Sequence, residues 1–185
     1  MLEESFFEHI DPILAPLGFL PGDGEEFRDP PLDVLRYYRR PVRLHWLPFL
    51  GRAQGVVAVV RQPVDVGVAG RPGGDLTAFR ARVASAASNR FPPSRAFGWG
   101  SLGLTVVMLT PEPIGPEDDQ ALEKAMARDP RSRAIVLGLI RVNLGQEAMS
   151  YQIVEGPVGL FPEPVALVDG LTSRFRRLVP FFSGE

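Results

Sequence analysis

Cysteine is absent from the 185-residue chain, lysine occurs once and histidine occurs twice. The lack of cysteine excludes thiolate catalysis, cysteine-bound zinc, iron–sulfur clusters and disulfides. The one lysine, Lys124, lies in a helix-forming stretch, where a solvated surface role is favoured over lysine chemistry. His9 and His45 do not have the spacing of a histidine metal motif. We therefore expect no metal and no cofactor.

A strong charge of one sign and long apolar stretches are also missing. Twenty basic residues against 22 acidic ones give a formal charge of -2, which provides no overall field to attract nucleic acid or an anionic membrane. No uncharged apolar stretch approaches the about 18 residues of a membrane span. The first residues, Met1-Leu2-Glu3-Glu4, are acidic where a signal peptide is basic. We expect a soluble, cytoplasmic protein.

The residues that are present have the composition of a globular protein. Hydrophobic residues make up 45% of the chain and charged residues 23%. A chain of this length buries roughly 70% of its unfolded surface, so it does not need disulfides or a bound metal ion to fold. We expect residues 1–185 to form a single α+β domain. All basic residues except Lys124 are arginine, so arginine clusters partly reflect composition.

Apolar residues at helical spacing, together with capping signals, predict four helices. Pro12 falls inside the first of them and predicts a kink or a fresh turn there. Acidic residues after Pro116 favour the start of the third helix. The predicted helices are 3–17, 75–90, 116–128 and 165–179.

Three apolar stretches rich in β-branched residues predict buried strands: Gly55–Arg61, Leu102–Leu109 and Ala134–Val142. Their alternation with helices favours right-handed crossovers and a partly parallel sheet. Residues 21–31 have the composition of a loop. Two short strands, Leu32–Arg40 and Val42–Phe49, are predicted on either side of Pro41. Residues 149–154 are predicted to form a hairpin strand, with helix left open for 144–152. Together, these elements predict a mixed central sheet of about five or six strands with four helices packed on it.

Acidic residues follow the three buried strands. They are Asp65, Glu112 and Glu147. Ligands gather at the carboxyl ends of parallel strands, and three carboxylates meeting there would suit a magnesium ion and phosphoester hydrolysis. The same residues are also ordinary in solvated turns, and the missing lysine weakens a nuclease interpretation. A metal-dependent phosphoester hydrolase is therefore an alternative hypothesis.

Two further segments carry binding signals. In the glycine-rich stretch 67–74, Arg71, Gly73 and Gly74 form a candidate anion loop before a helix, although Asp75 would compete with an anion for the free amides. The segment 36–46 interleaves arginine with aromatic residues, as single-strand-binding surfaces do. Its candidate contacts are Arg36, Tyr38, Arg39, Arg40 and Arg43. The competing interpretation is a half-buried pair of strands, and the near-neutral charge disfavours nucleic acid as the partner.

The end of the sequence is apolar, and we predict that it forms an interface through Leu178, Phe181 and Phe182. Because the common nucleophile motifs are missing or out of context, catalysis is less favoured than binding. The sequence thus predicts a non-catalytic binding or interaction module. It would associate with a protein partner or with itself, and a homodimer is the simplest form.

Overall fold

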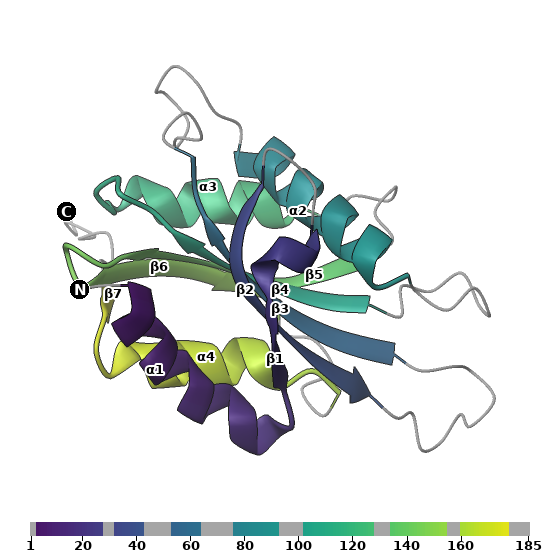
Figure 1. Ribbon diagram of the computed structural model, residues 1–185. Helices are drawn as coiled ribbons and strands as arrows, with labels where there is room; N and C mark the ends of the chain where they lie inside the picture. The colour runs from purple at the N-terminus through teal and green to yellow at the C-terminus, as the bar shows by residue number, and fades with distance from the viewer. Residues whose placement is uncertain are drawn as a thin grey trace.

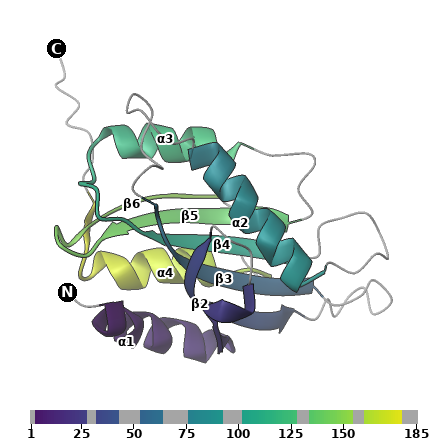
Figure 2. The same ribbon diagram turned by 45° about the horizontal axis from the view of Figure 1, so that its top comes forward.

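The computed structural model describes residues 3–27, 32–42, 53–63, 76–92, 102–127, 134–154 and 160–177. Within these ranges, seven strands form one mixed sheet in which the strands lie side by side in chain order. Helices α1 (Glu3–Leu14) and α4 (Glu163–Thr172) cover one face, and α2 (Leu76–Arg90) and α3 (Glu117–Met126) cover the other (Figures 1 and 2). The predicted α+β fold with a mixed sheet and four helices is confirmed, with seven strands instead of five or six.

The centre of the sheet consists of three parallel strands, β3 (Ala53–Arg61), β4 (Leu102–Leu109) and β5 (Ala134–Asn143). Their crossover helices α2 and α3 lie on the same face, because consecutive right-handed crossovers that advance in one direction place their helices on one side. The outer strands are β1 (Leu20–Asp23), β2 (Asp33–Val42), β6 (Ala148–Ile153) and β7 (Arg176–Arg177). β1 pairs with β2, β2 with β3 and β6 with β5 in the antiparallel direction, whereas β7 pairs with β6 in parallel.

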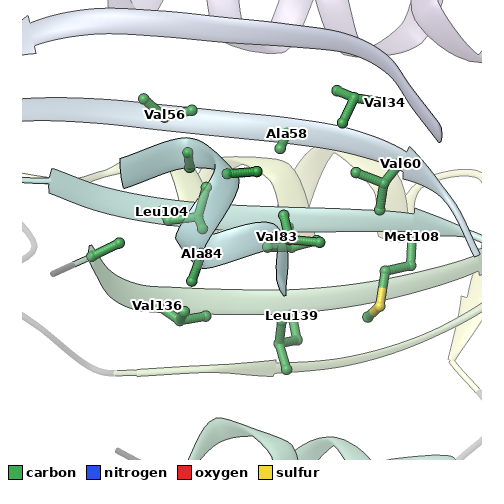
Figure 3. Close-up of a cluster of buried hydrophobic side chains, with 14 of the residues drawn as sticks. Val34, Val56, Ala58, Val60, Val83, Ala84, Leu104, Met108, Val136 and Leu139 are labelled. Atoms are coloured by element: carbon green, nitrogen blue, oxygen red, sulfur yellow. The ribbon is translucent and has the colours of Figure 1, made fainter. Parts of the chain in front are cut away.

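Side chains that alternate along the central strands form two cores. Val56 and Val60 of β3, Leu104 and Met108 of β4 and Val83 of α2 belong to the core under α2 and α3 (Figure 3). The intervening residues of the same strands face α1 and α4 and form the second core with Phe6, Ile10, Leu14, Leu167 and Phe175. Burial on both faces explains why these strands are continuous apolar stretches in the sequence.

Glycines on three neighbouring strands allow the first turn of α4 to approach the sheet. A Cβ atom on Gly103 would lie 2.6 Å from the ring of Phe161, and one on Gly55 would lie 3.2 Å from a carboxylate oxygen of Glu163. Gly138 is less crowded, since its nearest contacts would be 3.3 Å away. Because these positions lack side chains, the start of α4 packs close to the sheet backbone. Glu163 is buried there.

Several boundaries differ from the predicted ones. The first helix is α-helical only to Leu14 and continues as a 3-10 turn to Leu17, with Pro12 inside the α-helix. The last helix ends at Thr172 instead of continuing to residue 179, and β7 follows it. The predicted loop 21–31 contains most of β1 and a 3-10 turn over Gly24–Phe27.

The predicted strands also need correction at two places. Instead of a break at Pro41, β2 continues through it to Val42, where Pro41 lies opposite Gln54. Residues 43–49 of the second predicted strand lie outside the described ranges. The choice left open for 144–152 is resolved, because Leu144–Glu147 form a turn and β6 follows. In the part of the chain that the structure describes, every helix is too short or too polar to cross a bilayer.

Candidate ligand-binding site at the carboxyl end of the parallel strands

A cavity of about 610 Å³ opens where the three parallel strands end. It is bounded by the last residues of β3, β4 and β5 and the residues that follow them, by Asp33 at the start of β2 and by Glu3 at the start of α1. The antiparallel strand β2 contributes here because it begins where β3 ends, with Asp33 opposite Arg61. We call this cavity the carboxyl-end cavity.

Apolar side chains make up much of its wall. They are Pro63, Leu109, Pro111 and Leu144. Leu109 is buried in the core under α1 and α4, and Leu144 packs against that core from the β5–β6 turn. A concave, mostly apolar wall with a few polar groups is typical of ligand sites, and the ends of parallel strands are where such sites form.

The charged residues of the cavity form one cluster at its mouth. The Arg61 guanidinium donates hydrogen bonds to both carboxylate oxygens of Glu3, at 2.9 Å each, and also pairs with Asp33. The hydrogen bond with Glu3 raises the pKa of Arg61. Among the described residues, two carboxylates share one cation, so this cluster of three side chains carries a net charge of about -1 while each member has a partner.

Beneath the cavity, Arg141 of β5 is fully buried, with 0% of its surface exposed. Its Nε donates to Oε1 of Gln62 at 3.0 Å, and its Nη2 donates to the Thr110 hydroxyl at 3.3 Å. Two carboxylates balance its charge: Asp118 forms an ion pair with Nη1, and Glu112 lies 3.6 Å from Nη2. Because Gln62 and Thr110 also line the cavity, this network fixes part of its wall.

A second set of hydrogen bonds holds the loops around the cavity together. Asn143 donates from Nδ2 to the carbonyl oxygens of Glu112, at 2.8 Å, and Pro111, at 3.3 Å. Its Oδ1 accepts from the backbone N–H of Gln146 at 2.8 Å, and the side chain of Gln146 accepts from the N–H of Ile114 at the same distance. The segment after β4 and the β5–β6 turn are therefore joined to each other, which pre-organises the cavity.

The three acids predicted at strand ends are not shown to meet. Glu112 is half-buried and faces Arg141, whereas Glu147 is exposed in the β5–β6 turn with a left-handed φ of 49°. Asp65 lies outside the described residues. Within those residues, no group of three histidine, aspartate or glutamate side chains is placed to hold a metal ion. Glu112, at the carboxyl end of the strands, faces Arg141 and no described acid joins it as a metal ligand.

The arginine and tyrosine residues of β2 are divided between the two faces of the sheet. Tyr38 is 1% exposed and donates its hydroxyl hydrogen to Asp11 at 2.7 Å, and burial raises its pKa. Arg36 lies 4.2 Å above the ring of Phe7 and pairs with Asp11 at 3.3 Å. The half-buried Arg40 lies against α4, and Arg39 is exposed. In this part of the segment the tyrosine rings are not available for stacking on bases.

The remaining predicted site residues lie outside the described ranges. These are Arg43 of the basic segment, Arg71, Gly73 and Gly74 of the anion loop, and the interface residues Leu178, Phe181 and Phe182. Their predicted roles stay predictions.

Sequence reasoning did not single out Glu163, the first residue of α4. Its side chain is 0% exposed, and neither carboxylate oxygen has a hydrogen-bond partner in the described structure. The nearest cation is Arg40, whose Nη2 lies 3.9 Å away and donates to the carbonyl oxygen of Leu160 at 2.6 Å. Burial raises the pKa of Glu163 to about 7. A signal was present in Gly55 and Gly103, since glycines in buried strands often mark a close approach of another element.

No protein-family model, curated protein or solved structure matches this chain. The inference about function therefore rests on the site itself.

Proposed function

We propose that this protein is a non-catalytic binding module whose ligand occupies the carboxyl-end cavity. The observation that carries the proposal is the combination of an apolar wall with charged groups that are already paired. Leu109, Pro111 and Leu144 offer apolar contact, and Arg61 is shared by two carboxylates at the mouth. Such a surface favours binding through buried apolar area and a few hydrogen bonds.

The buried network supports binding over catalysis. A catalytic acid or base must be able to exchange a proton with its substrate, so it needs access to the reacting atoms. Arg141 is instead enclosed by Asp118, Glu112, Gln62 and Thr110, where it stabilises the loops and not a reacting group. Asp118 and Glu112 thus compensate the buried charge of Arg141.

The proposal is tested by a fragment screen on ¹⁵N-labelled protein. Binding in the cavity should shift the amide signals of Gln62, Thr110 and Gly145 together. A Gly145→Trp variant should abolish these shifts, because Gly145 lines the cavity and a Cβ there has open space apart from the Asn143 side chain at 3.4 Å. Gly145→Ala is the matched control, since it changes the same backbone position without filling the cavity.

Two results would reject the proposal. One is a screen in which no fragment shifts the cavity amides of the wild-type protein. The other is a set of shifts that survives in Gly145→Trp, which would place the binding elsewhere. Far-UV circular dichroism of both variants checks that the fold is retained.

A further inference from the structure

We infer that the ligand of the carboxyl-end cavity is a small organic cation, in which an apolar group carries a protonated amine. The inference rests on the proposed function, because it names the chemical class of the ligand of the same cavity. It follows from the charge and the polar atoms that the described residues at the mouth leave uncompensated.

The wall of the cavity selects the apolar part of the ligand. Pro63, Leu109, Pro111 and Leu144 line it, and their side chains offer no hydrogen bond. Asn143 also lines the cavity, but its side chain already binds backbone groups of both neighbouring loops. The volume of about 610 Å³ is in the range of small-molecule sites. A small ligand therefore contacts this wall through hydrocarbon groups.

The mouth disfavours a negatively charged ligand. Arg61 is the only basic side chain among the described residues that line the cavity. Its Nε and Nη2 donate to Glu3 and its Nη1 donates to Asp33, so each guanidinium nitrogen already has an acceptor. An incoming carboxylate or phosphate would have to displace one of these carboxylates and would then lie beside both of them. Like charges placed together in this way oppose binding.

The same groups favour a cation. Glu3 and Asp33 contribute two negative charges and Arg61 contributes one positive charge. Asp33 accepts from Arg61 through Oδ2, and its Oδ1 has no hydrogen-bond donor among the described residues. The Glu3 and Asp33 side chains are 39% and 50% exposed, so an ammonium group can approach them while it keeps part of its hydration. We therefore assign Oδ1 of Asp33 as the acceptor for the ammonium group.

The network beneath the cavity has an excess of the same sign. Among the described residues, Asp118 and Glu112 surround the single guanidinium of Arg141, so two carboxylates again accompany one cation. Gln62 and Thr110 connect this network to the cavity wall. Because buried charges are screened less by salt than exposed ones, this second excess adds to the attraction for a cation in the cavity.

The test compares three probes that share one phenyl ring: phenethylamine, phenethyl alcohol and hydrocinnamate. Each is titrated into ¹⁵N-labelled protein while the amide signals of Gln62, Thr110 and Gly145 are followed. At low salt the amine should bind about threefold to tenfold more tightly than the alcohol, and the carboxylate more weakly than the alcohol. The advantage of the amine should shrink at high salt, because exposed charges are screened.

Variants at the mouth assign the preference to this cluster. Asp33→Asn and Glu3→Gln each make the cluster neutral, so in both variants the amine should lose most of its advantage while the affinity for the alcohol stays unchanged. An unchanged affinity for the alcohol also shows that the wall has kept its shape. Glu123→Gln is the control, because it removes the same charge from the exposed surface of α3 and should preserve the advantage. Gly145→Trp should abolish the binding of the amine and the alcohol.

Several results would overturn the inference, and they separate it from the proposed function. Equal affinities for the amine and the alcohol at low salt, or tightest binding of the carboxylate, refute the cation and leave the cavity as a binding site. An advantage of the amine that persists in both Asp33→Asn and Glu3→Gln refutes the assignment to the mouth. Failure of the amine to bind while other fragments still shift the cavity amides also refutes only this inference. If neither the probes nor any fragment shifts these amides, the proposed function fails as well.

Discussion

Replacing Glu163 with glutamine should change how the stability of the protein depends on pH. The carboxyl group is fully buried at the start of α4, has no hydrogen-bond partner from another described residue and lies 3.9 Å from Arg40. Burial disfavours the charged form, and this effect outweighs the backbone N–H of Glu163 itself and the Arg40 guanidinium, both of which favour the charged form. The pKa of Glu163 consequently rises from 4.5 to about 7.

The sign and the size of the effect follow from this pKa. Because the pKa is higher in the folded protein, the folded state retains a proton that the unfolded chain has released, so stability falls as the pH rises through this window. Each pKa unit is worth about 1.4 kcal/mol, which makes the total about 3 kcal/mol. Of this, about 2.5 kcal/mol should be lost between pH 5 and pH 8.

Urea unfolding followed by circular dichroism at pH 5, 6, 7 and 8 measures the effect. The difference in unfolding free energy between Glu163→Gln and wild type should shift by about 2.5 kcal/mol in favour of the variant across this range. Any constant offset reflects contacts of the new amide, and groups common to both proteins cancel. Glu8→Gln, on the exposed surface of α1, is the control and should run parallel to wild type. A Glu163→Gln curve that also runs parallel to wild type would refute the reasoning.

Three further substitutions have expected outcomes in the same unfolding assay. Arg40→Gln should destabilise the protein more at pH 8 than at pH 5, because it leaves the ionised carboxylate of α4 without its cation; an equal loss at both pH values would contradict this. Arg141→Met should cost about 3–5 kcal/mol by leaving buried carboxylates unpaired, and Asp118→Asn in the same chain should recover part of the loss. Gly103→Ala should cost about 1–3 kcal/mol through overpacking, and Gly138→Ala less, since its Cβ would have no neighbour closer than 3.3 Å.

The central strands could be predicted from the sequence because their signal is local. Leu102–Leu109 matches β4 at both ends, and the predicted strands at 55–61 and 134–142 fall within two residues of β3 and β5. Burial on both faces requires an uninterrupted apolar stretch, and glycine or proline nearby marks its limits. The helix–strand alternation then determined the parallel arrangement through the handedness of crossovers.

The short edge strands could not be predicted because their pairing partners define them. The β1 sequence, Leu-Pro-Gly-Asp, has the composition of a turn, and it is a strand because Leu20 to Asp23 pair with Arg39 to Arg36 of β2. The last helix ends early for a different reason. The hydroxyl groups of Thr172 and Ser173 donate to carbonyl oxygens of the preceding turn, which competes with continuation of the helix.

The sequence predicted acidic residues at the ends of the parallel strands but not their partners. The strand-end rule pointed to Glu112 and to the segment after β5, and the carboxyl-end cavity is bounded by the segments that follow β4 and β5. The partner of Glu112, however, is Arg141. This arginine lies within a mostly apolar strand, so its sequence neighbours give no sign of an ion pair. The arginine faces α3 because it shares the parity of Leu139, and it meets Asp118 only because α3 begins over that face. Such an ion pair depends both on the register of the strands and on where the helix lies over the sheet. Neither can be predicted from the spacing of residues along the sequence.

Arg141 and Glu163, two of the buried charged residues, lie near opposite ends of the parallel strands and differ in how their charges are compensated. This difference supports the proposal that the ligand binds at the carboxyl end. Arg141 has two carboxylates and two neutral acceptors around it, which offset the cost of removing its charge from water. Among the described residues, Glu163 has one cation at 3.9 Å and no hydrogen-bond partner from another residue, so its charge remains costly. The hydrogen bonds of Arg141 therefore connect the ends of β3 and β4 through Gln62 and Thr110, whereas the start of α4 carries a carboxyl group whose pKa is raised to about 7. Since affinity depends on a cavity that is already formed, the paired charges at the carboxyl end support the proposed site there.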